Sequence, residues 1–406
     1  MQPLMGADEA RAIFDTAFPL PDRRERVATA EALGRVLAES LVSPEDLPPF
    51  RRSLMDGYAV RAADTTGATP EALRWLVVVA DIAMGAAVER RIGPGEAARV
   101  PTGGMIPEGA DAVVIVEQTR EEEGRVAVPA PITPGRHLIE RGEDVRRGDP
   151  LLAAGHRLRP QDLGALLGLS ILEVAVYQRP RVGIISTGDE VVPPDRIPAP
   201  GQIRDMNSSA LAAMVTHVGA IPHRYGIVRD ERETLAAAAA TALTECDVLI
   251  LNGGTSVGAK DHVAPVIDRL GAPGVLVHGI NIRPGKPTVL AVCAGKPVFG
   301  LPGQPVSALN TLELFVAPVL RQMLRLPDDT PRVLARLTAG VRSADGREDH
   351  VRVRLEARPD GVWATPIPGV SAMISTMVWA DGIMVVPAGS PGFAAGEAVE
   401  VRLFRA

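Results

Sequence analysis

The chain has 406 residues, room for roughly two to four domains, and 46% of them are hydrophobic, which excludes a largely disordered protein. Aromatic residues make up only 3% and the formal net charge is −6, so neither a base-stacking surface nor a general nucleic-acid binder is expected. Only three of the 43 basic residues are lysines, and all three (Lys260, Lys286 and Lys296) fall in one stretch of the chain.

Residues 1–42 are predicted to form two helices. Apolar residues recur at helical spacing around Phe14 and again up to Leu37, and Thr29 suits the N-cap of the second helix. From residue 44 to about residue 134, short apolar runs alternate with glycine and proline. This texture predicts a mainly-β segment with long loops.

Helical spacing returns at Pro160, which suits a first helical position, and Gly168 suits the helix end. The segment after residue 135 therefore resembles residues 1–42 more than it resembles the block between them. This similarity predicts that the mainly-β block is inserted into a helical domain, which it splits in two.

The next segment, residues 181–324, alternates strand and helix patterns. Strands are expected at 182–185, 248–251, 275–278, 288–292 and 298–301, and helices at 207–218, 231–245, from about 261, and at 305–324. Such alternation predicts a parallel sheet with helices on both faces. From residue 331 onward the alternation of a half-buried sheet returns, with Pro359-Asp360-Gly361 as a hairpin turn.

The predicted fold class is a multidomain α/β protein. It combines a doubly wound α/β domain with a split helical domain, an inserted mainly-β domain and a C-terminal β-barrel-like domain. The predicted boundaries are 1–43 with 135–178 for the split helical domain, 44–134 for the insertion, 179–326 for the α/β domain and 327–406 for the C-terminal domain.

The two cysteines, Cys246 and Cys293, lie in apolar runs without a partner at a characteristic spacing, so reduced core thiols are expected. No signal peptide is expected at the N-terminus. The longest uncharged run, residues 361–380, contains prolines and glycine that disfavour a membrane-spanning helix. We therefore expect a cytoplasmic protein without a membrane partner.

Three predicted strands of the α/β domain end in loops suited to anion binding. These loops are Ser186–Glu190, Asn252–Asp261 and Pro302–Ser307. In doubly wound sheets, ligands bind beyond the carboxyl ends of the strands, and glycine-rich loops let backbone N–H groups approach a phosphate. The alternative is that they are tight structural turns.

Two known motifs fit this stretch only superficially. Gly279 to Lys286 resembles a phosphate-binding P-loop, but the glycine spacing is one residue too long and Pro287 stands where a magnesium-binding hydroxyl belongs. The run from Gly254 to Gly258 matches a nucleophile elbow centred on Ser256. A serine hydrolase would then need a later acid and histidine, and the adjacent Asp349 and His350 are poorly placed for that role.

Acidic residues gather at the same predicted edge of the sheet. They are Asp189, Glu190, Asp205, Asp230 and Asp261. Surface solvation explains any one of them, but several beside predicted phosphate sites indicate magnesium held through carboxylates. Of the three lysines, Lys260 closes the loop Asn252–Asp261 and Lys286 lies in Arg283–Pro287, both at the predicted anion end of the sheet, whereas Lys296 is expected to be a plain turn residue.

At these residues the sequence resembles the molybdopterin molybdenumtransferases, the molybdenum insertases that include the E domain of gephyrin. The resemblance covers nearly the whole chain. Its motifs are Ser53–Val60, Thr102-Gly103-Gly104 with Pro107–Val113, Gly142-Glu143-Asp144, Ser186–Glu190, Gly201-Gln202-Ile203 with Asp205 and Asn207, Gly253–Gly258 with Asp261, Pro284–Pro287 and Leu301–Ser307.

The resemblance implies an enzyme that binds adenylylated molybdopterin, hydrolyses the adenylate, inserts molybdate into the dithiolene and releases AMP, with Mg²⁺ as the cofactor. It also implies a homodimer in which the α/β domain of one subunit faces the β insertion of the other. Residues 179–326 would then be the molybdopterin-binding domain and the split domain would serve dimerisation. An adenylyltransferase that supplies the substrate and enzymes that accept the finished cofactor are further expected partners.

The resemblance also implies roles for individual residues. The implied catalytic residues are Asp56, Thr102, Glu190, Asp230, Asp261 and Lys286. The implied substrate-binding residues are Gly253, Gly254, Ser256, Gly258, Arg283, Pro302, Pro305 and Ser307. Asp261 and Glu190 are the implied metal ligands.

Some positions depart from the family pattern. Arg51-Arg52 replaces the usual Asp-Asn before Ser53, and Gln304 stands where Asn is usual. Two alternatives therefore stay open beside the molybdate insertase: a non-catalytic molybdopterin-binding scaffold and a tungstate-preferring insertase. The serine hydrolase built on Ser256 is the remote third.

Overall fold

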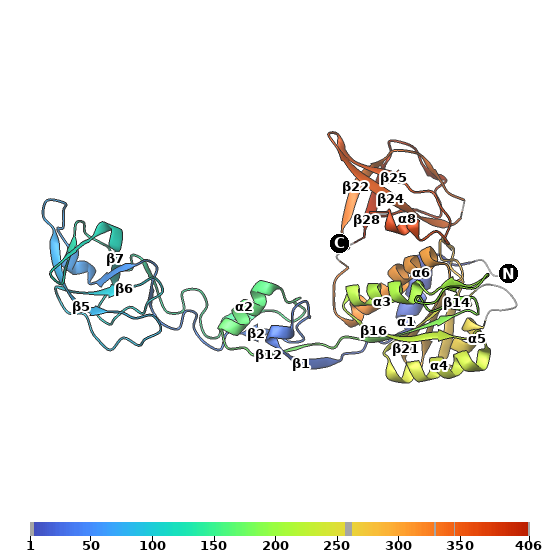
Figure 1. Cartoon of the computed structure of the whole chain (residues 1–406), viewed down its shortest axis with the longest axis horizontal. Helices are drawn as coiled ribbons and strands as arrows, with labels where there is room; N and C mark the ends of the chain where they lie inside the picture. Colours follow the sequence, from blue (N-terminus) through green and yellow to red (C-terminus); the bar gives the residue numbers. More distant parts are fainter. Residues whose placement is uncertain (1–3, 256–261, 329, 345, 405–406) are drawn as a thin grey trace. The chain divides into compact units, whose positions relative to one another are not determined.

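The computed structural model describes residues 4–255, 262–328, 330–344 and 346–404 (Figure 1). The chain forms two compact units, one of residues 26–176 and one of residues 1–25 with 177–406. None of the helices in these described ranges is long and apolar enough to cross a membrane.

A six-stranded sheet forms the centre of the second unit. Its strands follow the order β16-β13-β17-β21-β20-β18. Their bounds are Ile221–Val228, Arg181–Thr187, Val248–Asn252, Lys296–Leu301, Val289–Cys293 and Pro273–His278. The first four strands run parallel, as predicted, but β20 and β18 are antiparallel to their neighbours, so the expected all-parallel sheet is wrong. The cause is a tight hairpin at Ala294-Gly295, both with positive φ, which joins β20 directly to β21.

Helices cover both faces of this sheet, as the sequence predicted (Figure 1). On one face lie α1 (Ala7–Ala17), α3 (Asn207–Val218), α6 (Pro305–Thr311) and α7 (Ala317–Met323). On the other lie α4 (Arg232–Glu245) and α5 (Val263–Asp268). Strand residues alternate between the two apolar clusters: Ile184 and Ile250 face the first, and Ile185 and Leu249 face the second.

The predicted long helix at 305–324 is continuous but irregular. A π-helical segment, Leu312–Val316, separates α6 from α7. Pro318, in the first turn of α7, has no amide hydrogen for an α-helical bond, and the π segment lies just before it.

The second predicted N-terminal helix is wrong. After α1 the chain forms strand β1 (Arg24–Ala28) and a single 3-10 turn, Thr29–Glu31. Gly34 has φ of +73°, a left-handed conformation that ends any helix there, and Val36 and Leu37 instead make isolated β-bridges. The first helix, α1, packs its Phe14 against Phe299 of β21 with ring centroids 5.3 Å apart. The predicted helix at Pro160 is confirmed as α2 (Pro160–Gly168).

The predicted insertion is mainly β, as expected. Its sheet has the order β7-β4-β6-β5-β9-β8. The bounds are Ala112–Ile115, Gly57–Val60, Glu96–Val100, Arg74–Asp81, Arg125–Val128 and Arg120–Glu122. Short pairs flank it: β3 (Arg52–Ser53) with β10 (Leu138–Ile139), β2 (Leu41–Val42) with β11 (Pro150–Leu152), and β1 with β12 (Glu173–Tyr177).

The C-terminal domain is the expected barrel. Its strands follow the order β24-β25-β22-β28-β26, and a further pairing of β24 with β26 closes the ring. The bounds are Glu348–Arg358, Gly361–Pro366, Arg332–Leu337, Ala398–Leu403 and Gly382–Val386. The smaller elements are β14 (Val191–Val192), β15 (Ile203–Arg204), β19 (Ile282–Arg283), β23 (Val341–Arg342), β27 (Gly392–Phe393) and α8 (Ser375–Val378).

Candidate functional site

The loops predicted to bind anions lie at one edge of the α/β sheet. Ser186 pairs with Asn252, and Asn252 pairs with Leu301, so β13, β17 and β21 end together. Because β18 and β20 are antiparallel to each other, the loop between His278 and Val289 leaves the sheet at the same edge. The mixed topology therefore brings the loop with Arg283 and Lys286 beside the other three.

Hydrogen-bonding groups without a partner lie at this edge. Ser186 and Thr187 are buried at the end of β13, and neither hydroxyl oxygen has a hydrogen-bond partner in the part of the chain that the structure describes. Gly253 lies directly beside them: its φ is +106°, and a Cβ there would overlap the Thr187 carbonyl oxygen. Buried polar atoms in proteins are normally satisfied, so unpaired ones at a glycine loop indicate a place for a ligand.

Carboxylates surround the same loop. Asp230 has one buried carboxylate oxygen that no described residue contacts by a hydrogen bond, and this oxygen lies 3.5 Å from where a Cβ on Gly254 would be. The Asp230 amide donates to Asp189 at 3.4 Å. The Glu190 carboxylate folds back over Gly188, since a Cβ there would lie 2.9 Å from both of its oxygens.

Asp205, which the sequence grouped with these acids, has a different role. It is buried, and its carboxylate accepts the Ser208 amide hydrogen at 3.0 Å, in the first turn of α3. This bond gives Asp205 a structural role at the start of α3, and its part in a metal site stays a prediction.

The loop after β21 carries Pro302, Pro305 and Ser307. Pro302 and Ser307 are buried, Gly303 and Gln304 are exposed, and Pro305 begins α6. Val306 donates its amide hydrogen to Ser371 of the C-terminal domain at 3.1 Å. The predicted substrate-binding loop is therefore bordered by the segment around Gly369 and Ser371.

The loop between β18 and β20 presents Arg283 and Lys286 as exposed side chains. Asn310 of α6 fixes this loop by donating to the Pro284 carbonyl oxygen at 2.8 Å. A Cβ on Gly285 would overlap the Thr311 methyl group, so the loop backbone lies directly on α6.

Arg352 is a functional candidate that the sequence reasoning missed. It is only 7% exposed, and its Nε has no hydrogen-bond partner among the described residues. One Nη donates to the Gly369 carbonyl oxygen at 3.0 Å. Burial lowers the pKa of Arg352, and the nearby Arg283 guanidinium lowers it further. Along β24, Arg352 and its neighbour Val353 point to opposite faces of the sheet. An arginine at such a position normally faces solvent, so the sequence carried no signal that Arg352 is buried.

Within residues 26–176, the structure brings Asp56 and Thr102 together. Thr102 donates both its amide hydrogen, at 2.6 Å, and its hydroxyl, at 2.9 Å, to one oxygen of Asp56. These two bonds lower the pKa of the Asp56 carboxyl below its ordinary 3.8, so Asp56 stays ionised at neutral pH. Both side chains are exposed, which leaves the second carboxylate oxygen accessible.

The departures Arg51 and Arg52 lie on the neighbouring chain segment. The Arg51 guanidinium lies 2.9 Å from a Glu140 carboxylate oxygen and donates to the Ala110 carbonyl oxygen, so it has a local structural role. Arg52 is exposed. Gln304 is also exposed and supplies the N-cap backbone of α6, but its side chain makes no capping bond.

Four predicted residues, Ser256, Gly258, Lys260 and Asp261, lie outside the described residues. The other two residues of the serine-hydrolase hypothesis, Asp349 and His350, do not support it. His350 contacts Glu348 at 2.7 Å, and Asp349 instead accepts hydrogen bonds from Arg347 and Ser343. Asp349 therefore does not orient His350 as a catalytic triad requires.

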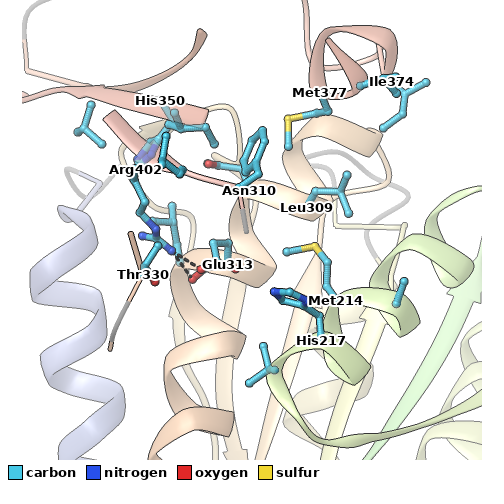
Figure 2. A pocket seen from close by; sticks show the side chains of 18 of the residues that line it. Met214, His217, Leu309, Asn310, Glu313, Thr330, His350, Ile374, Met377 and Arg402 are labelled. Atoms are coloured by element: carbon cyan, nitrogen blue, oxygen red, sulfur yellow. Dashed lines mark hydrogen bonds and ion pairs between the residues drawn. The ribbon is translucent and has the colours of Figure 1, made fainter. Parts of the chain in front are cut away.

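A separate cavity of about 500 Å³ lies between α3, α6 and the C-terminal barrel. Figure 2 shows Met214, Leu309 and Met377 on its wall and Arg402 bonded to Glu313 at one end. Its lining includes His350 of the hydrolase hypothesis but none of the residues predicted to bind molybdopterin, molybdate or Mg²⁺. The edge that carries the predicted anion loops is thus distinct from this largely apolar cavity.

Comparison with known proteins first gives the class. Residues 183–322, which hold the sheet and its loops, match the family described as "Probable molybdopterin binding domain". Residues 5–170 match the "MoeA N-terminal region (domain I and II)" and residues 334–404 the "MoeA C-terminal region (domain IV)".

The full-length relatives give the family. Molybdopterin molybdenumtransferase 2 of Mycobacterium tuberculosis is 37% identical over 380 residues, covering 92% of this chain and 94% of that protein. The molybdopterin molybdenumtransferase of Bacillus subtilis is 34% identical over 396 residues, covering 96% and 91%. A solved structure of the molybdopterin biosynthesis MoeA protein from Pyrococcus horikoshii has a TM-score of 0.87 at 37% identity and covers 100% of both chains. The chain therefore belongs to the MoeA family of molybdopterin molybdenumtransferases, enzymes of molybdenum cofactor biosynthesis.

Proposed function

We propose that this chain hydrolyses adenylylated molybdopterin, inserts molybdate into its dithiolene and releases AMP. The observation that carries the proposal is the pair of guanidiniums of Arg283, in the loop between β18 and β20, and Arg352, on β24 of the C-terminal barrel. Arg352 is nearly buried beside Arg283, and neither has a carboxylate partner in the described chain. Two such cations repel each other unless an anion joins them, and molybdate is a doubly charged oxyanion.

The position of Arg352 also supports an oxyanion substrate. Its guanidinium is held by Gly369, and the same segment accepts the amide hydrogen of Val306 at the start of α6. An anion at Arg352 would therefore lie near the loop of Pro302, Pro305 and Ser307. The sequence resemblance assigned this loop to the molybdate side of the substrate.

Magnesium fits the carboxylates at the other side of the edge. Among the described residues, no three His, Cys, Asp or Glu side chains lie close enough together to hold a metal ion by themselves. Mg²⁺, however, usually binds one or two carboxylates together with substrate phosphates and water. Asp230 offers a buried, unpaired oxygen, and its amide contacts Asp189, the chain neighbour of Glu190. The ion would neutralise charge on the phosphoanhydride, with Asp230 and Glu190 as ligands here and Asp261 as the third expected one.

The proposed reaction has two balanced steps. In hydrolysis, a water oxygen bonds to phosphorus while the phosphoanhydride bond breaks, and AMP leaves. In insertion, the two dithiolene sulfurs bond to molybdenum, and their protons leave with one oxide ligand as water. Lys286 and the Gly254 amide would hold the phosphate, and Arg283 and Arg352 would hold molybdate.

The proposal includes a homodimer, because Asp56 and Thr102 belong to the other compact unit and the family resemblance places them opposite the α/β domain of a second subunit. It also includes a cytoplasmic location, an adenylyltransferase as supplier and cofactor-dependent enzymes as recipients. Both cysteines are free and buried, in keeping with a reducing compartment.

The test is AMP release from adenylylated molybdopterin, measured by chromatography with molybdate and with tungstate, each with and without Mg²⁺. We expect AMP only when both oxyanion and Mg²⁺ are present, with molybdate the better substrate. Binding of the substrate without AMP release would contradict the proposal and favour the scaffold function. Faster release with tungstate would identify a tungstate-preferring insertase.

A further inference from the structure

We infer that Asn252 and Asn207 are positioning residues that set the spacing of the two substrate loops at the edge of the sheet. This inference rests on the proposed function. Asn252 is the last residue of β17, directly before the Gly253-Gly254 turn, and is only 4% exposed. Asn207 is the first residue of α3. Neither residue is placed in contact with substrate.

Their side-chain amides join three chain segments. Asn252 donates to the Pro302 carbonyl oxygen at 2.9 Å and accepts a hydrogen bond from Asn207 at 2.9 Å. Asn207 also donates to the Gly303 carbonyl oxygen at 2.8 Å. The turn after β17 and the loop after β21 are thus bound to each other and to α3 through two adjacent amides.

The backbone contacts show that the two loops joined by these amides lie very close together. Gly253 donates its amide hydrogen to the Leu301 carbonyl oxygen at 3.0 Å, and a Cβ on Gly303 would lie 3.5 Å from the Gly253 Cα. At such close approach, losing one amide changes the separation of the loops. The Gly253 loop would hold phosphate and the Pro302 loop faces molybdate, so this separation sets the distance between the two reacting ends of the substrate.

An asparagine suits this place because it donates and accepts at once. The Pro302 carbonyl oxygen and the Asn207 side-chain amide both contact the Asn252 side chain. A side chain with only donors would bond the carbonyl but repel the amide, and one with only acceptors would do the reverse. In Asn252→Asp, a carboxylate oxygen faces the Pro302 carbonyl oxygen in place of the donor. The side-chain volume is almost unchanged, so the substitution tests the hydrogen bond rather than the packing.

The experiment measures AMP release by the wild type, Asn252→Asp, Asn207→Ala and the double variant Asn252→Asp/Asn207→Ala. Since small misplacements of reacting groups cost up to about 100-fold, we expect kcat to fall about 10- to 100-fold in each single variant. KM for adenylylated molybdopterin should change less than about threefold, because the groups that bind it remain. The double variant should lose no more than the worse single one, as expected of residues that act together.

The control is Leu235→Ala, a buried α4 residue of the opposite apolar cluster. It should lower the melting temperature without changing kcat. If Asn252→Asp and Asn207→Ala lose no more kcat than this control at matched melting temperature, or if their losses are additive, the inference is wrong. Should Asn252→Asp fail to fold, the half-exposed Asn207→Ala decides the question by the same criterion.

Hydrogen exchange separates failure of this inference from failure of the proposed function. Peptides containing Gly253 and Gly303 should exchange faster in both single variants than in the wild type. A wild type that releases no AMP overturns the proposed function, whatever the exchange shows. An active wild type whose loop peptides exchange unchanged in the variants overturns the positioning role alone.

Discussion

Substitution of Arg352 by glutamine should weaken molybdate binding while leaving the fold intact. Arg352 is 7% exposed, and its Nε has no hydrogen-bond partner in the described chain. A hydrogen bond to a charged group contributes about 1.5–3 kcal/mol, so losing one such bond to molybdate should raise KM for molybdate by about 10- to 150-fold.

Stability should respond in a different way. The variant loses the bond from the charged guanidinium to the Gly369 carbonyl oxygen, worth about 1.5–3 kcal/mol, but also removes a buried charge that is repelled by Arg283. These opposing effects should leave the free energy of unfolding within about 1 kcal/mol of the wild type. Arg352→Gln should therefore lower the affinity for molybdate while the free energy of unfolding stays almost unchanged.

The assay is the initial rate of AMP release against molybdate concentration at saturating adenylylated molybdopterin, with urea unfolding of the same samples. Arg354→Gln is the matched control, since Arg354 lies two residues along β24 and is exposed. Its KM should not change. A KM for molybdate within threefold of the wild type in Arg352→Gln, or an equal rise in both variants, would refute the reasoning.

Three further predictions follow from described contacts. Lys296 donates to two carbonyl oxygens at the end of α4, at 2.6 and 2.8 Å. Lys296→Met should therefore lower the free energy of unfolding, measured by urea titration, by about 1.5–3 kcal/mol and leave kcat unchanged. Lys286→Met, by contrast, should lower the rate of AMP release and leave the free energy of unfolding unchanged. Thr102→Val removes the hydroxyl donor and should move the Asp56 pKa back up toward 3.8 in a carboxyl NMR titration. In the wild type, the stability contributed by this carboxylate is present above pH 3.8 and is lost as the pH falls through the lowered pKa. An unchanged Asp56 titration in the variant would contradict the role of the Thr102 hydroxyl. Asp230→Asn should raise the Mg²⁺ concentration needed for half-maximal AMP release by about tenfold or more, and an unchanged Mg²⁺ dependence would remove Asp230 from the metal site.

Local patterns predicted most elements of the α/β domain because their apolar runs are clear, but the edge strand β16 (Ile221–Val228) was missed. The range 207–218 is α3 to the residue, and 231–245 matches α4 within one residue. The second N-terminal helix failed because Leu33, Val36 and Leu37 have helical spacing, yet Gly34 adopts positive φ between them. One backbone conformation outweighed the side-chain pattern.

Strand direction was beyond the sequence reasoning. An apolar run reads the same in parallel and antiparallel sheets, and the Ala294-Gly295 turn beside Lys296 was expected without its consequence for β20 and β18. Motifs located the glycine loops and Lys286, but not Arg352 or the bonds of Asn252. Those depend on burial and on partners distant in the chain, such as Gly369 and Pro302.

The scarcity of lysine makes the amines of this chain a selective chemical reporter. Lys296 has its Nζ engaged by two backbone carbonyl oxygens, whereas Lys286 is exposed on the loop between β18 and β20. An acylating reagent used at limiting dose should therefore modify Lys286 well before Lys296. Mass spectrometry of the Lys286 peptide, with and without bound substrate, would then report occupancy of the edge without any turnover.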